Sequence, residues 1–178
     1  TASINTGELD VKGVEAEAQY AVTERFLLGA NAAWNSSKFT SGVDASLTPN
    51  LGSPNVAGKY MALVPRFSGT ATATYTAPFG ADKDWFVRGD VVYVGSRYSD
   101  TSNTGETGAS TDLNLVAGMR WSALEISAYV NNVFDDQTVE SLRIQGDTGL
   151  DPFTFSRRAY EAVLPRRRQF GVAATLRF

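Results

Sequence analysis

The side chains best suited to bind a ligand lie in one long segment near the C-terminal end of the sequence. The segment carries arginine, aspartate and tyrosine side chains, which together can hold an anionic or polyhydroxylated molecule through charge-assisted hydrogen bonds. The same composition also suits an ordinary solvated loop, so both interpretations stay open. The predicted ligand-binding residues are Arg143, Asp147, Arg157, Arg158 and Tyr160.

Enzyme chemistry is disfavoured by two residue types that the chain lacks. The 178 residues include no cysteine and no histidine. Their absence removes thiol nucleophiles, disulfides, the usual zinc ligand sets and the commonest general base at neutral pH. Asn131 and Asn132 lie near Tyr129, but this polar group contains no nucleophile with a base beside it. We therefore expect no catalytic residue, no metal and no cofactor.

Charge and hydropathy exclude two further classes of protein. The formal net charge is −3, so the chain has no basic field that would hold nucleic acid through its phosphates. No run of apolar residues approaches the roughly 18 that a membrane-spanning helix needs. Residues 1–9 also lack the basic and apolar regions of a secretion signal.

The elements that must position the ligand-binding segment are β-strands, because the hydrophobic period of the chain is two. Seven runs alternate, each with one face free of charged residues and an opposite face that is largely polar. The predicted fold class is therefore all-β and antiparallel. The runs cover residues 14–20, 26–35, 67–75, 85–94, 112–121, 124–131 and 169–178.

A soluble β-sandwich also alternates, but the connections and the aromatic residues favour a transmembrane β-barrel. Short connections alternate strictly with long ones, as tight periplasmic turns alternate with external loops in outer-membrane barrels. The short ones are 22–25, 78–84 and 122–123, and the long ones are 41–58, 99–110 and 133–168. Aromatic residues near the ends of the runs predict two rings at the lipid interfaces. These membrane-interface residues are Tyr20, Phe26, Trp34, Tyr75, Trp85, Tyr93 and Trp121.

Seven strands do not make a closed barrel. Single-chain bacterial barrels have even strand numbers, and an open sheet edge in lipid leaves backbone groups without hydrogen-bond partners. We therefore expect residues 1–178 to be the C-terminal part of a larger barrel, with further strands upstream or in a second chain.

Five short segments carry a resemblance to a known family. The segment 13–17 reads GVEAE and leads through a hairpin to LGAN at 28–31, and 64–67 reads VPRF. More specific are NNVFDD at 131–136 and PRRRQF at 165–170, separated by a long loop. In this order and spacing the chain resembles the last strands of the β-barrel of TonB-dependent outer-membrane receptors.

The resemblance implies a fold, a location and a function. It implies a barrel of about 22 strands in the bacterial outer membrane, and the plug domain of such receptors is not part of this chain. The chain would supply wall and extracellular loops for uptake of a scarce nutrient, such as a metal chelate, cobalamin or a glycan. Expected partners are the TonB complex through the plug, lipopolysaccharide and outer-membrane lipid, the remaining strands of the same receptor, and the barrel assembly machinery. The assembly signal would be Phe170, Val172, Ala174, Leu176 and Phe178.

Two charged groups have further interpretations. The run Arg166–Arg168 would contact lipopolysaccharide phosphates or close a charge network at the rim. Charges on the polar faces would pair with one another, or line a ligand path or hold the plug. They are Glu15, Glu17, Arg88, Asp90, Asp112, Arg120 and Glu125. The alternatives to an uptake receptor are a passive porin or other large outer-membrane barrel, and a soluble β-rich adhesin module.

Overall fold

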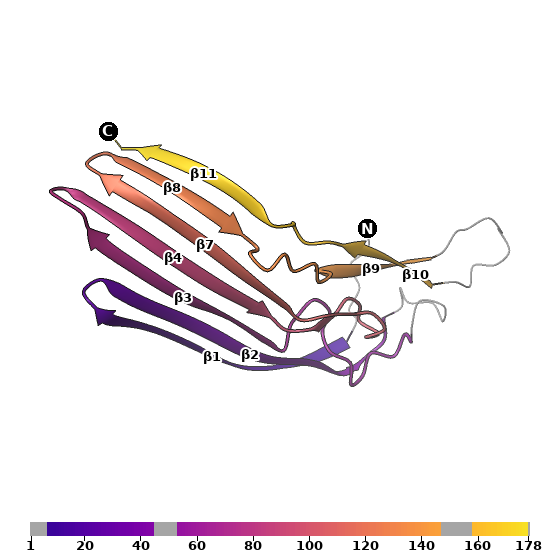
Figure 1. Ribbon diagram of the computed structural model, residues 1–178. Helices are drawn as coiled ribbons and strands as arrows, with labels where there is room; N and C mark the ends of the chain where they lie inside the picture. The colour runs from indigo at the N-terminus through magenta and orange to yellow at the C-terminus, as the bar shows by residue number, and fades with distance from the viewer. Residues whose placement is uncertain (1–6, 45–52, 147–157, 178) are drawn as a thin grey trace.

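Seven strands form one antiparallel sheet in the computed structural model, which describes residues 7–44, 53–146 and 158–177. No helix occurs in this described part of the chain. Figure 1 shows the strands side by side in a single curved sheet. They are β1 (Gly7–Thr23), β2 (Phe26–Gly42), β3 (Phe67–Pro78), β4 (Lys83–Val94), β7 (Ser110–Trp121), β8 (Leu124–Asn131) and β11 (Gln169–Leu176).

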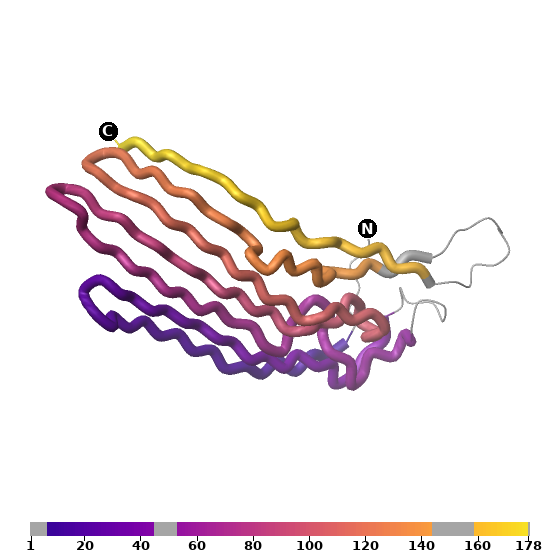
Figure 2. Tube along the Cα trace, viewed as in Figure 1, coloured from indigo at the N-terminus to yellow at the C-terminus, as the bar shows by residue number. Residues whose placement is uncertain are grey.

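The order of strands in the sheet follows the order in the chain. The sequence is β1-β2-β3-β4-β7-β8-β11, and every neighbouring pair is antiparallel. Figure 2 shows the Cα trace running back and forth along this path. All seven predicted strands are confirmed, although β1 and β2 extend to 17 residues each. Among the described residues, β1 and β11 each have only one strand neighbour in the sheet.

Two short hairpins lie within connections that the sequence analysis interpreted as loops. One pairs β5 (Arg97–Tyr98) with β6 (Glu106–Thr107), and the other pairs β9 (Ser141–Gly146) with β10 (Arg158–Val163). Figure 1 shows β9 and β10 beyond one end of the main sheet. The alternation of Leu142 and Ile144 with polar residues was the available signal for β9.

The connections sort into a turn end and a loop end of the sheet. At the turn end, two to four residues join β1 to β2, β3 to β4 and β7 to β8. Two of these turns use a non-glycine residue in the left-handed region, with φ of 54° at Asp82 and 51° at Ser122. At the loop end lie the long connections and both hairpins. The strict alternation predicted from the sequence is therefore confirmed.

The apolar face of the sheet is not covered by any part of the described chain. Phe170 is 72% exposed, Val172 is 75% exposed and Tyr20 is 68% exposed. Only Val56, Ala77 and Phe86 are buried hydrophobic residues among the described ones. A soluble sheet would bury such a face against a second layer, and this sheet has none in the described structure.

Aromatic side chains on the apolar face form two rows. Phe26, Tyr75 and Trp85 lie near the turn end, and Trp34, Phe67 and Tyr93 lie eight residues further along the same three strands. The Tyr75 and Trp85 rings are 5.3 Å apart between centroids, and Phe67 and Tyr93 are 5.9 Å apart. Eight residues span about 26 Å along a strand before tilt, which is comparable to the roughly 25 Å apolar band of a membrane-spanning barrel.

The opposite, polar face accommodates two aromatic rings beside glycines. Phe86 is paired in register with Gly118, and a Cβ on Gly118 would lie 2.8 Å from the Phe86 ring. The Arg120 guanidinium lies 4.6 Å from the centroid of the same ring. Tyr129 covers Gly171 in the same way, with 2.2 Å to the nearest ring atom. An apolar residue is therefore accommodated on the polar face at Phe86, because its ring packs against Gly118 and Arg120.

Among the described residues, no helix has the length and the hydropathy needed to cross a membrane.

Candidate functional site

Charged side chains on the polar face pair mainly with one another. Arg88 donates to Asp90 at 2.7 Å, and Thr72 donates to the same carboxylate at 2.8 Å. Arg120 lies 3.4 Å from Asp84 and 3.7 Å from Glu125. The predicted pairing is thus seen for Arg88, Asp90, Arg120 and Glu125. Within the described part of the chain, no ion pair forms at Glu15, Glu17 or Asp112.

Asn132 connects three segments at the loop end of the sheet. Its backbone N–H donates to Asn114 on β7 at 3.0 Å. Its side-chain amide donates to the carbonyls of Asp136 at 2.9 Å and Arg166 at 3.0 Å, and its side-chain oxygen accepts the Asp136 N–H at 2.8 Å. The residue is buried and has φ of 50°, a conformation that asparagine tolerates better than most residues. It therefore ties the end of β8 to β7 and to the segment that enters β11.

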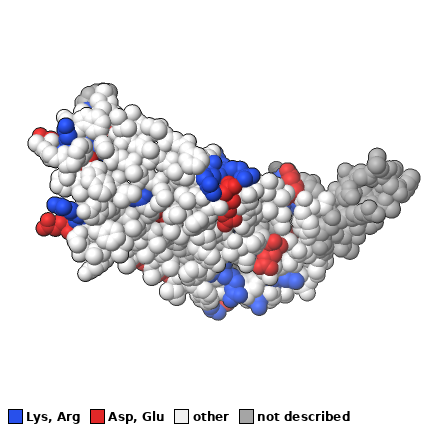
Figure 3. Space-filling view, in the orientation of Figure 1, with Lys and Arg blue, Asp and Glu red and all other residues white. Residues whose placement is uncertain are grey.

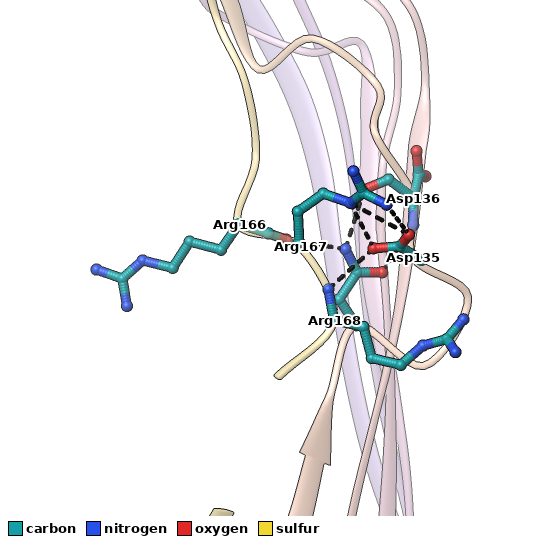
Figure 4. Close-up of polar contacts among 6 residues, drawn as sticks. Asp135, Asp136, Arg166, Arg167 and Arg168 are labelled. Atoms are coloured by element: carbon teal, nitrogen blue, oxygen red, sulfur yellow. Dashed lines mark hydrogen bonds and ion pairs between the residues drawn. The ribbon is translucent and has the colours of Figure 1, made fainter. Parts of the chain in front are cut away.

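Asp135 and Arg167 form a second connection beside Asn132, which we call the rim clasp. Arg167 donates through Nε at 2.9 Å and through Nη2 at 2.6 Å to the two carboxylate oxygens, and the Arg168 N–H donates to Asp135 at 2.9 Å. Figure 4 shows Arg167 turned toward Asp135 while the side chains of Arg166 and Arg168 point away. The Arg167 hydrogen bonds, followed by the Arg168 N–H, hold the pKa of Asp135 well below its usual range.

The rim clasp confirms one of the two interpretations of the run Arg166–Arg168, because Arg167 takes part in a charge network at the rim. The neighbouring Asp136 fixes the start of β7 in a similar way. It accepts the Thr111 N–H at 2.9 Å and both donors of Thr138, at 2.8 Å for the N–H and 2.6 Å for the hydroxyl. These bonds, the Thr138 hydroxyl first, lower the pKa of Asp136.

A polar hollow of about 390 Å³ opens on the polar face beside the rim clasp. Strands β7, β8 and β11 position its side chains in register, since Asn131 is paired with Gln169 across β8 and β11. Amide, carboxylate and arginine groups meet there, so the hollow can both donate and accept hydrogen bonds. Its polar lining residues include Asp112, Asn114, Asn131, Glu140, Arg166 and Gln169.

The predicted ligand-binding residues are only partly described by the structure. Arg143 is exposed on β9 and is paired in register with Glu161 on β10. Tyr160 is paired with Ile144, one position away, so it projects from the opposite face of the hairpin to Arg143. The backbone of Arg158 opens β10, whereas Asp147 and Arg157 lie outside the described residues. The structure therefore does not bring Arg143 and Tyr160 to one surface.

The hairpins of the loop end contact each other. Arg97 donates to the Glu140 carbonyl at 2.5 Å, and a Cβ on Gly105 would lie 2.9 Å from the Tyr160 ring. Asn103 bonds to both the N–H and the carbonyl of Tyr60, at 2.6 and 2.8 Å. These contacts join separate outer loops into one layer.

Asp100 organises the turn between β5 and β6. Its carboxylate accepts the Ser102 hydroxyl at 2.5 Å, the Gly105 N–H at 2.8 Å and both donors of Thr104. Burial raises the pKa of Asp100, but these hydrogen bonds outweigh it and the pKa is lowered overall. The sequence analysis missed Asp100, although the run of Ser, Thr, Asn and Gly after it is typical of such turns.

No cluster of three potential metal-ligating side chains occurs within residues 7–44, 53–146 and 158–177. The polar groups described at the loop end are amides, carboxylates and guanidinium groups, which form hydrogen bonds and ion pairs.

Comparison with known families gives a match over most of the chain. Residues 1–133 match the family model described as TonB dependent receptor-like, beta-barrel. No curated protein sequence matches the chain.

Several solved structures share the fold over nearly the whole chain. The ferric yersiniabactin uptake receptor of Yersinia pestis is 22% identical, with a TM-score of 0.78 over 98% of this chain and 24% of its own. The ferric preacinetobactin receptor of Acinetobacter baumannii is 14% identical, with a TM-score of 0.69 over 97% of this chain and 23% of its own. A siderophore receptor of the same organism is 18% identical, with a TM-score of 0.67 over 94% of this chain and 22% of its own. The chain thus spans about a quarter of the length of these receptors, and it has the fold of part of their barrel.

Proposed function

The chain belongs to the family of TonB-dependent receptor β-barrels, and from this we propose that it forms part of the wall and the outer loops of a receptor that takes up a ferric chelate. In this arrangement the apolar face contacts lipid and the polar face lines the lumen, as in outer-membrane barrels. The loop end then faces the cell exterior, where the ligand is captured.

The polar hollow is the observation that carries the proposal. It lies where the lumen wall meets the outer loops, and its amide N–H groups and Arg166 can donate to the oxygen atoms around a chelated metal ion. Its carboxylates can accept hydrogen bonds from hydroxyl or N–H groups of the chelator. Two similar structures are receptors of ferric ligands and a third is a siderophore receptor. This likeness favours a metal chelate over cobalamin or a glycan.

Energy coupling follows from membership of the family. We infer that transport is driven by TonB through a plug domain, with residues 1–178 forming the C-terminal part of a barrel of about 22 strands. The edges of β1 and β11 that lack a described neighbour would pair with the remaining strands of the same receptor.

With its apolar face against lipid, the protein would lie in the bacterial outer membrane, in contact with lipopolysaccharide and other lipid. The alternating apolar residues of β11 would be recognised by the barrel assembly machinery. Of the predicted assembly signal, Phe178 lies outside the described residues. We propose no enzymatic activity for this chain.

The proposal is tested by iron-limited growth of a strain that lacks the receptor. Restoring the full-length receptor should allow growth on at least one ferric chelate, and radioactive iron uptake should require TonB. Uptake that persists without TonB would indicate a passive porin instead. A parent protein that stays monodisperse in plain buffer without detergent would indicate a soluble module.

A matched pair of glutamine variants tests the polar hollow itself. Gln169→Ala removes a lining side chain and should weaken ferric chelate binding about 3- to 10-fold, the value of one hydrogen bond. Gln19→Ala removes the same type of side chain from β1, which is the outermost strand at the other edge of the sheet from β11. This substitution should leave binding unchanged. Equal effects of the two substitutions would remove the hollow from the proposed binding site.

A further inference from the structure

The polar hollow has an unequal distribution of charge. Two of its lining side chains are carboxylates, on Asp112 and Glu140, and two are guanidinium groups, on Arg166 and Arg167. The Arg167 guanidinium is already paired with the Asp135 carboxylate at 2.6 Å. The carboxylates of the lining therefore outnumber the remaining guanidinium group, which belongs to Arg166.

Asp112 is the acidic residue that the sheet itself fixes in the hollow. It lies near the loop end of β7 and projects from the polar face. The neighbouring charges that act on its carboxylate are those of Asp136 and Glu140, and both are negative. Asp136 is held in place, because its carboxylate accepts the Thr111 N–H and both donors of Thr138. We call Asp112, Asp136 and Glu140 the acidic wall.

The arginines around the hollow do not cancel the acidic wall. Arg97 donates to the backbone carbonyl of Glu140 at 2.5 Å, and Arg166 lines the hollow whereas Arg168 does not. Figure 4 shows the Arg166 side chain extended away from Asp136. Even when Arg97 and Arg166 are both counted, the three carboxylates of the acidic wall exceed the positive charge beside them.

The opposite face of the sheet directs this field toward the hollow. Figure 3 shows the apolar face, where Lys, Arg, Asp and Glu are nearly absent between the turn end and the loop end. A charged surface backed by a low-dielectric wall concentrates its field on the aqueous side. The negative potential of the acidic wall therefore acts mainly on a molecule that enters the hollow.

The other polar groups of the hollow are uncharged amides that can donate hydrogen bonds. Asn131 and Gln169 are paired in register across β8 and β11, and both are exposed. The side-chain oxygen of Asn114 accepts the Asn132 N–H at 3.0 Å, so the group that this amide can still offer a ligand is its NH₂ donor. Such donors bind the oxygen atoms of a chelate without requiring that the chelate be an anion.

We propose that the polar hollow selects ferric chelates that are uncharged or positive and discriminates against anionic ones. This proposal rests on the proposed function, since it names the class of chelate for the same site. Charge divides the common iron-binding groups, because three singly negative hydroxamates cancel the charge of Fe³⁺, whereas three doubly negative catecholates leave an excess of negative charge. The acidic wall therefore favours a ferric hydroxamate.

The test uses one chelator scaffold, so that charge is the main variable. A linear trihydroxamate loaded with Fe³⁺ is prepared with a free terminal amine, with that amine acetylated, and with that amine succinylated, which gives a positive, a neutral and a negative complex. Each is titrated into the purified full-length receptor in detergent, and binding is followed by quenching of tryptophan fluorescence. The positive complex should bind about 10-fold more tightly than the negative one, the size of a few exposed charge pairs. This preference should shrink as salt is raised.

Substitutions in the acidic wall should remove the preference. D112N/E140Q keeps the size of both side chains and should bring the positive and negative complexes within about 2-fold of each other. The matched control E24Q/D82N makes the same two chemical changes at the turn end, where both residues are exposed, and should keep the full preference. E140K should favour the negative complex. If D112N/E140Q lacks the heat-dependent gel shift of a folded barrel, E140K decides, because Glu140 is exposed and precedes β9.

Several outcomes would overturn the proposal. They are equal affinities of the three complexes for the unmodified receptor, tighter binding of the negative complex, and an equal loss of preference in the matched control. Failure of all three complexes to bind would also overturn it, while TonB-dependent uptake of an anionic ferric chelate would keep the proposed function and contradict the charge selection. A charge preference without TonB-dependent uptake of any chelate would support the acidic wall and contradict the proposed function.

Discussion

The turn end and the loop end of the sheet are closed by different kinds of interaction. At the turn end, two to four residues reverse the chain, and left-handed residues such as Asp82 and Ser122 set the geometry. At the loop end, buried or half-buried side chains join segments far apart in sequence, as Asn132 does with Asn114 and Arg166. One end depends on local backbone conformation, and the other depends on long-range hydrogen bonds.

Under the proposed function, the loop end would provide both stability and ligand recognition, whereas the turn end provides stability alone. Short turns need little sequence beyond the residues that reverse the chain, so they leave few groups free to bind a ligand. The loop end holds its polar groups in fixed positions through Asn132, Asp135 and Asp136, and the polar hollow lies directly beside them. Fixed polar groups lose less entropy when a ligand binds.

The largest effect should come from Asn132→Ala. The substitution leaves the Asp136 N–H and the carbonyls of Asp136 and Arg166 without their partner, at about 1 kcal/mol each, and places alanine at a φ of 50°. We expect the free energy of unfolding of the receptor in lipid vesicles to fall by about 3 kcal/mol, measured by urea titration. Asn131→Ala, at the exposed neighbouring residue, should change the free energy of unfolding little. Similar losses in both variants would show that the stability of the loop end does not depend specifically on Asn132.

A somewhat smaller effect is expected for Gly171→Ala on β11. The added Cβ would lie 2.2 Å from the Tyr129 ring, so the ring must move, at a cost of about 1 to 3 kcal/mol. Gly29→Ala is the matched control, because its nearest neighbours would be 3.8 Å away. Urea titration should show a loss for the first variant and almost none for the second; an unchanged Gly171→Ala receptor would mean that the ring does not occupy this space.

Acid should loosen the loop end before the turn end. The pKa of Asp135 is lowered in the folded state, mainly by Arg167, so its contribution to stability is complete above the ordinary carboxyl pKa of about 4 and is lost as the pH falls below it. Hydrogen exchange of residues 132–136 should accelerate below pH 4 while the turn at 122–123 is unaffected. Asp135→Asn should reduce this pH dependence, and the remainder should be lost when Asp136, whose pKa is also lowered by hydrogen bonds, is replaced by asparagine as well. A pH dependence that is unchanged in Asp135→Asn would show that the rim clasp does not contribute to it.

The smallest expected effect is a gain, from Ser122→Gly at the turn end. Glycine adopts a φ of 51° without the steric cost that serine pays, but it loses more chain entropy on folding. We expect the free energy of unfolding to rise by about 0.5 kcal/mol. A loss of stability in the same urea titration would show that the serine side chain, rather than backbone conformation, matters in this turn.

The strands and their faces were predictable because period-two alternation is a local property. Every predicted run became a strand, and the apolar residues of each run share one exposed face. The segment NNVFDD was recognised as a family motif, yet its roles were not, since the sequence does not tell which of Asn131 and Asn132 turns inward. The hairpin β9–β10 was missed because its two strands are short and separated by a long connection.

The sequence by itself determined the alternation, the sorting of turns and loops, and the uncharged face, because each depends only on neighbours along the chain. The tertiary structure decided which partner each polar group takes. Three successive arginines are equivalent in sequence, but the pairing of β11 with β8 places Arg167 against Asp135 and directs Arg168 away. Register between distant strands sets that choice, and it is fixed only when the whole sheet is assembled.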